Sequence, residues 1–116
     1  MADQVAAKPL TLEIQRTGDV AVVRCHGKLV AGVTNTLYYE VRQLIPGSKR
    51  IVLDLSDLTH MDSTGLGALV RLHVSARSAG SSLELINLSQ AVSKIFALTN
   101  LLSVFSIIGE QNIKMG

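Results

Sequence analysis

The chain has 116 residues, 47% of them hydrophobic, which suits one compact domain with its own core. Charged residues make up 17%, with 11 basic and 9 acidic side chains, so the composition does not indicate a disordered chain. The basic residues are scattered along the sequence, and the chain has two Tyr, two Phe and no Trp. A surface for nucleic acid is therefore not expected, because it needs clustered cations or stacking aromatic rings.

A single cysteine, Cys25, excludes an internal disulfide and a zinc ribbon, and it is expected to be a small core residue. No stretch reaches the roughly 18 consecutive apolar residues that a membrane span requires. The first residues also lack the apolar core of a signal peptide. These observations predict a cytoplasmic protein.

Residues 1–9 are small and polar and end at Pro9, so they are interpreted as a flexible leader before a domain over residues 10–116. Alternating apolar residues around Thr17-Gly18-Asp19 predict a β-hairpin. A helix follows from about Val33 to Ile45, with Thr34 or Asn35 as its cap and Pro46-Gly47 as its end.

The rest of the chain alternates strands with helices. The expected elements are a buried parallel strand at 51–55, a helix from Ser63 to about Ser78 ended by Gly80, a strand at 83–86, a helix at 90–98 and a strand at 104–108. Residues between 55 and 63, including His60, are expected to form a loop. The order is ββαβαβαβ, which predicts a single α/β domain with a mostly parallel sheet and one antiparallel edge.

The loop that leads into the second helix is the most informative segment. Asp62, Ser63 and Thr64 are each able to cap that helix, and Gly65 and Gly67 allow another chain to approach its backbone. A phosphate on a hydroxyl here would lie at the positive end of the helix and would add about 1.5 to 2 negative charges. Such a charge is able to repel a docked partner, so this segment is a candidate switch.

The segment Met61-Asp62-Ser63-Thr64-Gly65-Leu66-Gly67-Ala68-Leu69, preceded by Ile51-Val52-Leu53-Asp54-Leu55-Ser56, resembles the signature of STAS domains, in particular bacterial anti-sigma factor antagonists. The resemblance extends to Gly27-Lys28-Leu29, which is similar to a glycine-led turn after the second strand of the family. It also includes the third-helix segment at 88–99. Lys28 and Val30 depart from the family, which commonly has acidic residues at these two positions.

The resemblance implies that Ser63 is phosphorylated by an anti-sigma factor that is also a serine kinase. The unphosphorylated protein would bind this partner and release the sigma factor, and a phosphatase would reverse the modification. ATP and magnesium would belong to the kinase, and this chain would have no catalytic residue, cofactor or metal of its own. The loop from Lys28 to Thr34 is expected to complete the partner surface. The expected partner-binding residues are Lys28, Val30, Met61, Asp62, Thr64, Gly65, Leu66 and Gly67.

Three alternatives remain open. The first is a STAS scaffold or regulatory subunit, for example of a stressosome-like or lipid-transport complex, in which Ser63 only caps a helix; the missing acid at Val30 favours it. The second is a phosphate-bearing small molecule bound at the same helix start. The third is an enzyme, which co-purified nucleotide with turnover would support. His26, His60 and His73 lack the spacing of a metal site, and His73 is expected to be partly buried.

Overall fold

In a computed structural model, which describes residues 9–99 and 106–108, the chain forms a five-stranded sheet in the order β1-β2-β3-β4-β5. β1 pairs antiparallel with β2, and all the other neighbouring strands are parallel. The predicted α/β class, element order and antiparallel edge are confirmed. The strands are β1 (Leu10–Thr17), β2 (Val20–Leu29), β3 (Arg50–Met61), β4 (Ser82–Ile86) and β5 (Ser106–Ile108).

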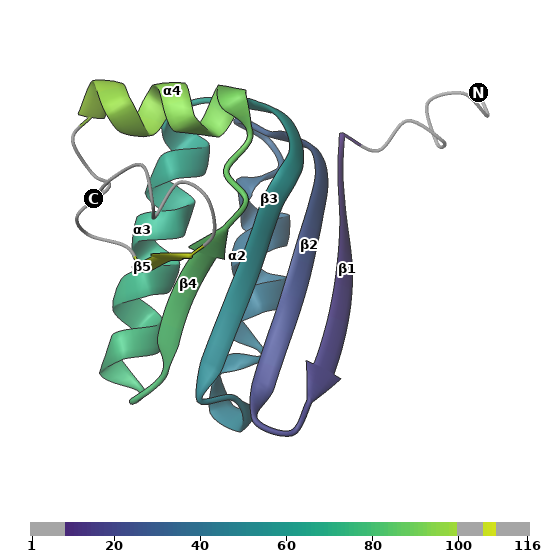
Figure 1. The fold of residues 1–116 in the computed structure, drawn as a ribbon, viewed down its shortest axis with the longest axis vertical. Helices are drawn as coiled ribbons and strands as arrows, with labels where there is room; N and C mark the ends of the chain where they lie inside the picture. The colour runs from purple at the N-terminus through teal and green to yellow at the C-terminus, as the bar shows by residue number, and fades with distance from the viewer. Residues whose placement is uncertain (1–8, 100–105, 109–116) are drawn as a thin grey trace.

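Helices α2 and α3 lie side by side against one face of this sheet, and α4 lies across the end where β3 ends (Figure 1). The helices are α2 (Thr34–Arg42), α3 (Ser63–Ser78) and α4 (Gln90–Thr99), with a short 3-10 helix at Ile45–Gly47. The core fills the space between the sheet and these helices. Cys25 is fully buried there, as predicted, and burial raises the pKa of its thiol to about 12.

The predicted strand at 51–55 is confirmed as a central strand, since Ile51 to Leu55 are all buried and Ile51 to Asp54 pair on both sides. However, β3 continues to Met61, so the prediction of a loop that includes His60 is wrong. The pairing of β2 with β3 shifts register twice, between Arg24 and His26 and between Gly27 and Lys28. These bulges interrupt the two-residue alternation that marks a strand in sequence, which explains the error.

Gly27 lies within β2 and does not form the turn that the family resemblance implied. Its φ of +109° and its contact with the backbone of Pro9 both require glycine, because a Cβ would lie 2.1 Å from the Pro9 carbonyl oxygen. The next amide, that of Lys28, donates a 2.7 Å hydrogen bond to the same oxygen. Gly27 therefore fixes the start of β1 against the end of β2.

The helix ends show how far local signals determine the backbone. Gly80 has φ +82° directly after α3, and the Ser81 amide donates to the Ala76 carbonyl at 2.8 Å, which is the expected glycine-terminated helix end. By contrast, the N-cap of α2 is Val33 and makes no side-chain capping bond, so the expected cap by Thr34 or Asn35 is wrong.

Candidate functional site at the start of helix α3

The first turn of α3 is capped by Asp62. One carboxylate oxygen of Asp62 accepts hydrogen bonds from the Thr64 amide at 3.0 Å and the Gly65 amide at 3.1 Å, and also from the Thr64 hydroxyl. These are amides that the helix itself leaves without partners. Of the three residues that the sequence offered as caps, the structure selects Asp62.

The second carboxylate oxygen of Asp62 binds a different part of the chain. It accepts a 3.0 Å hydrogen bond from the amide of Ala31, in the loop between β2 and α2. The Thr64 hydroxyl and then the Ala31 amide, together with the capped amides, lower the pKa of Asp62 to about 2. Asp62 therefore remains ionised at neutral pH and holds the two predicted segments of the site together. Sequence reasoning missed Ala31, because a backbone amide has no side-chain signature.

Ser63 is exposed at the first position of α3, and no hydrogen bond of its hydroxyl occurs among the described residues. The capping role that the scaffold alternative gave to Ser63 is wrong, since Asp62 takes that role. The neighbouring Thr64 hydroxyl is engaged by Asp62. Of the two adjacent hydroxyl groups, the one on Ser63 is thus open to a modifying enzyme.

The two glycines of α3 differ in what surrounds them. A Cβ on Gly65 would lie 2.3 Å from the Leu29 carbonyl oxygen, whereas a Cβ on Gly67 would meet nothing within 4 Å. Gly65 therefore allows α3 to pack against the end of β2. Gly67 is exposed, and only there does the lack of a side chain leave the helix backbone open to another molecule.

Of the remaining predicted site residues, some are buried beneath the site and others are exposed on it. Leu66 is buried at 5% exposure and Met61 packs partly against the core, so they support the site from beneath. Lys28 is exposed and Val30 is half-buried near the end of β2. Beside them, the end of β3 and α4 enclose an open groove of about 680 Å³. Its lining includes Val30, Met61, Asp62, Lys94, Ile95 and Leu98.

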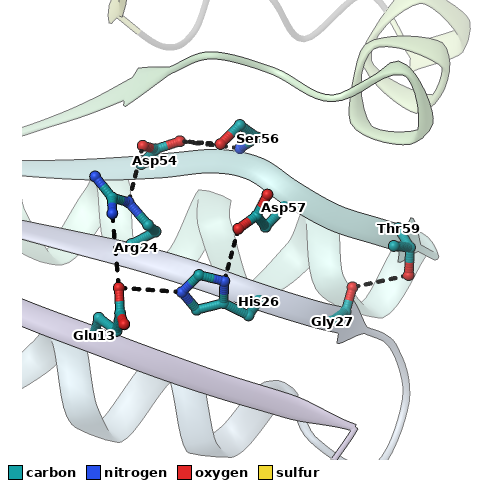
Figure 2. Close-up of polar contacts among 8 residues, drawn as sticks. All are labelled: Glu13, Arg24, His26, Gly27, Asp54, Ser56, Asp57 and Thr59. Carbon is teal, nitrogen blue, oxygen red and sulfur yellow. Dashed lines mark hydrogen bonds and ion pairs between the residues drawn. The ribbon is translucent and has the colours of Figure 1, made fainter.

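A polar network that sequence reasoning missed covers the sheet face opposite α2 and α3 (Figure 2). His26 Nδ1 lies 2.8 Å from Asp57 Oδ2, and His26 Nε2 lies 3.3 Å from Glu13 Oε1. Arg24 joins the network through Glu13 at 3.8 Å and through Asp54 at 3.4 Å. The register shift after Arg24 is what places Asp57 opposite His26, so spacing in the sequence does not reveal the pair.

Asp54 is a buried charge within this network, at 6% exposure. Burial opposes its ionisation, but hydrogen bonds from the Ser56 amide at 3.0 Å and hydroxyl at 2.8 Å, together with the charge of Arg24, outweigh burial. The pKa of Asp54 therefore lies below its ordinary value. Within the described residues, no group of three or more His, Cys, Asp or Glu side chains is arranged to hold a metal ion.

His73 on α3 is partly buried, as predicted; burial and then the charge of Arg77 lower its pKa. Residues 1–8 of the predicted leader and residues 104 and 105 of the strand predicted at 104–108 lie outside the described residues. Within the described part of the chain, no helix is long and apolar enough to cross a membrane.

Comparison with known sequences gives partial matches to regulatory proteins. The chain is 40% identical over 53 residues to the anti-sigma-B factor antagonist of Bacillus subtilis, covering 46% of this chain and 49% of that protein. It is 38% identical over 55 residues to the anti-sigma-B factor antagonist of Listeria monocytogenes, covering 47% of this chain and 48% of that protein. The chain thus matches about half the length of these relatives.

Solved structures share the whole fold. An anti-sigma factor antagonist from Mycobacterium paratuberculosis superposes with a TM-score of 0.78 at 18% identity, covering 91% of both chains. The anti-sigma factor antagonist SpoIIAA in its unphosphorylated form gives a TM-score of 0.72 at 20% identity, covering 89% of this chain and 92% of SpoIIAA. At these identities the likeness concerns the fold alone.

The family model for the STAS domain matches residues 11–114, which is nearly the whole chain. The match includes β3, the Asp62 cap and the glycines of α3, and the folded arrangement agrees with that of the two anti-sigma factor antagonists above. This chain therefore belongs to the STAS domain family.

Proposed function

We propose that this protein is an anti-sigma factor antagonist whose binding is controlled by phosphorylation of Ser63. In this proposal the unphosphorylated chain binds an anti-sigma factor with serine kinase activity, and the sigma factor is released. Phosphorylation by that partner ends the binding, and a phosphoserine phosphatase restores it. The chain acts as substrate and ligand, without catalytic residues of its own, in the cytoplasm where sigma factors act.

The observation that carries the proposal is the environment of Ser63. Its hydroxyl is exposed and unbonded among the described residues, while the hydroxyl of Thr64 is held by Asp62. Asp62 already accepts the hydrogen bonds of the Thr64 and Gly65 amides. A phosphate on Ser63 would therefore stand beside an ionised carboxylate and face solvent, where it would alter the surface that a partner meets.

The partner surface would combine the start of α3 with the loop between β2 and α2. The hydrogen bond from the Ala31 amide to Asp62 fixes these two segments relative to each other. Gly67, one turn further along α3, lets a partner approach the helix backbone. The relatives from Bacillus subtilis and Listeria monocytogenes also favour this proposal, since both are anti-sigma-B factor antagonists.

The test is to purify the protein from its own host, to map phosphopeptides, and to measure binding to the purified anti-sigma factors of that host. We expect phosphate on Ser63, a Ser63→Ala variant that binds but is not phosphorylated, and a Ser63→Asp variant that binds weakly. Ser78→Asp places the same charge at the far end of α3, about 22 Å away at 1.5 Å per residue, and is the matched control. Tight binding by Ser63→Asp would contradict the phosphorylation switch.

One observation favours the alternative of a scaffold or regulatory subunit. Val30 stands where the family commonly has an acid, and it lines the groove together with Ile95 and with Leu98, which is 84% exposed. Exposed apolar side chains in a groove mark an interaction surface, which a scaffold subunit needs whether or not Ser63 is phosphorylated. If Ser63 carried no phosphate under any growth or stress condition and no anti-sigma factor bound, this alternative would replace the switch.

A further inference from the structure

Charge is distributed unevenly between the two faces of the described domain. Four acidic residues lie on the sheet face opposite the helices, and each of them contacts a basic side chain there. These residues are Glu13, Asp54, Asp57 and Glu84. In contrast, α3 contains no acidic residue over its 16 residues and contains Arg71, His73 and Arg77.

Two arginines on the helical face flank one aromatic ring. The Arg71 guanidinium lies 4.5 Å from the ring centroid of Tyr38, and the Arg42 guanidinium lies 5.8 Å from the same centroid. Neither arginine has a carboxylate within 4 Å among the described residues, whereas Arg24 and Arg50 on the sheet are paired. We call Arg42, Tyr38 and Arg71 the arginine bracket.

The bracket is not fully explained by stability of the domain. Arg42 stands in the last turn of α2, where a cation interacts favourably with the helix dipole. Arg71 lies in the middle of α3, where no such effect operates, and its planar donors are left facing solvent. The one acid of α2, Glu40, lines a hollow against β1, and among the described residues it forms no ion pair with Arg42 or Arg71.

The bracket is continuous with the surface of the proposed switch. Arg71 follows Gly67 by one helical turn and Ser63 by two, about 12 Å at 1.5 Å per residue. Next to it, Val74 is 56% exposed although it is apolar. A partner that covers the start of α3 and the open backbone at Gly67 would therefore reach Arg71 without crossing any acidic side chain of this helix.

We infer that the partner of this site is acidic where it covers α2 and α3, and that its carboxylates bind the arginine bracket of Arg42, Tyr38 and Arg71. The inference rests on the proposed function and adds the chemistry of its partner. Arginine presents paired donors that match a carboxylate, and stacking on Tyr38 orients Arg71 before binding. Phosphate at Ser63 would then have the same sign of charge as the partner, so the modification would oppose the attraction that the bracket provides.

The inference is tested by measuring association and dissociation rates with the purified anti-sigma factor that binds the wild-type protein, across a range of salt concentrations. We expect Arg71→Glu to weaken binding about tenfold or more, mainly through slower association, and to reduce the salt dependence. Arg71→Lys keeps the charge but loses the paired donors and the planar stacking on Tyr38, so its affinity should lie between those of wild type and Arg71→Glu, with a salt dependence close to that of wild type. Lys49→Glu, an exposed site at the opposite end of the sheet from Ser63, is the control with the same change of charge and should change binding less than about twofold.

Thermal melts show whether each variant is still folded, so that a loss of binding is not mistaken for unfolding. Arg42→Glu is a second reversal of charge within the arginine bracket. Binding that is equal for wild type, Arg71→Glu and Arg42→Glu would overturn the acidic partner while leaving the switch at Ser63 intact. Absence of any anti-sigma factor that binds the wild type would overturn the proposed function and this inference with it.

A second binding assay uses vesicles that contain phosphatidylserine. Vesicle binding that Arg71→Glu abolishes, with unchanged binding to the anti-sigma factor, would assign the bracket to an anionic lipid surface and overturn the inference.

Discussion

Gly65 and Gly67 lie two residues apart on α3, and the same substitution is expected to have opposite effects on stability at the two positions. Replacing a helical glycine by alanine stabilises a helix by about 0.5 to 1 kcal/mol. At Gly67 nothing lies within 4 Å of the added Cβ, so the full gain is available. We expect Gly67→Ala to raise the free energy of unfolding by that amount and the Tm by roughly 4 °C.

At Gly65 the added Cβ would lie 2.3 Å from the Leu29 carbonyl oxygen and 2.9 Å from the Leu29 Cγ. The backbone of α3 or of β2 therefore has to move, and overpacking of this kind costs about 1 to 3 kcal/mol. Against the helical gain, Gly65→Ala should lower the free energy of unfolding by about 0.5 to 2 kcal/mol. The start of α3 would also move away from the end of β2.

Urea unfolding followed by circular dichroism measures both variants on one scale. Binding to the anti-sigma factor supplies the second measurement: Gly67→Ala should bind more weakly although it is more stable, because its methyl group occupies the open backbone. A Gly65→Ala as stable as wild type would refute the packing of α3 against β2, and a destabilised Gly67→Ala would refute the open surroundings of Gly67. A Gly67→Ala that binds as well as wild type would show that the partner does not approach the helix backbone at this position.

Other consequences follow from the cap and the core. The pKa of Asp62 is about 2 in the folded state, below the ordinary value of 3.8. The contribution of the Asp62 carboxylate to stability is therefore complete above pH 3.8 and is lost as the pH falls towards 2. Asp62→Asn should flatten this part of a curve of stability against pH, measured by thermal melting. Cys25, buried and with a pKa of about 12, should resist iodoacetamide at pH 8 until urea unfolds the domain, and rapid labelling of the folded protein would contradict its burial. Leu69→Ala, at a fully buried position, should lower the free energy of unfolding in urea by about 2 to 5 kcal/mol. Val74→Ala, on the exposed side of the same helix, should lower it by less than about 0.5 kcal/mol. Similar losses for the two variants would contradict the orientation of α3.

The course of β3 could not be predicted from the sequence because it depends on its neighbour. Ile51 to Leu55 form an apolar run that identifies a buried strand by itself. Beyond it, residues such as Asp57 and His60 have the polar character of a loop, yet hydrogen bonds to β2 keep them extended. Two register shifts place these side chains, and a register shift is a property of two strands rather than of one segment.

Local chemistry along the chain was sufficient for the order of strands and helices, for the buried Cys25 and for the end of α3 at Gly80, because each depends on neighbours within a few residues. It also placed three candidate caps in a row, but it could not rank them. Packing made that choice: Asp62 is the residue that reaches both the first turn of α3 and the Ala31 amide, 31 residues earlier in the chain. The same packing left the Ser63 hydroxyl exposed and brought Arg71 over Tyr38, since contacts between distant segments exist only once the sheet and helices have assembled.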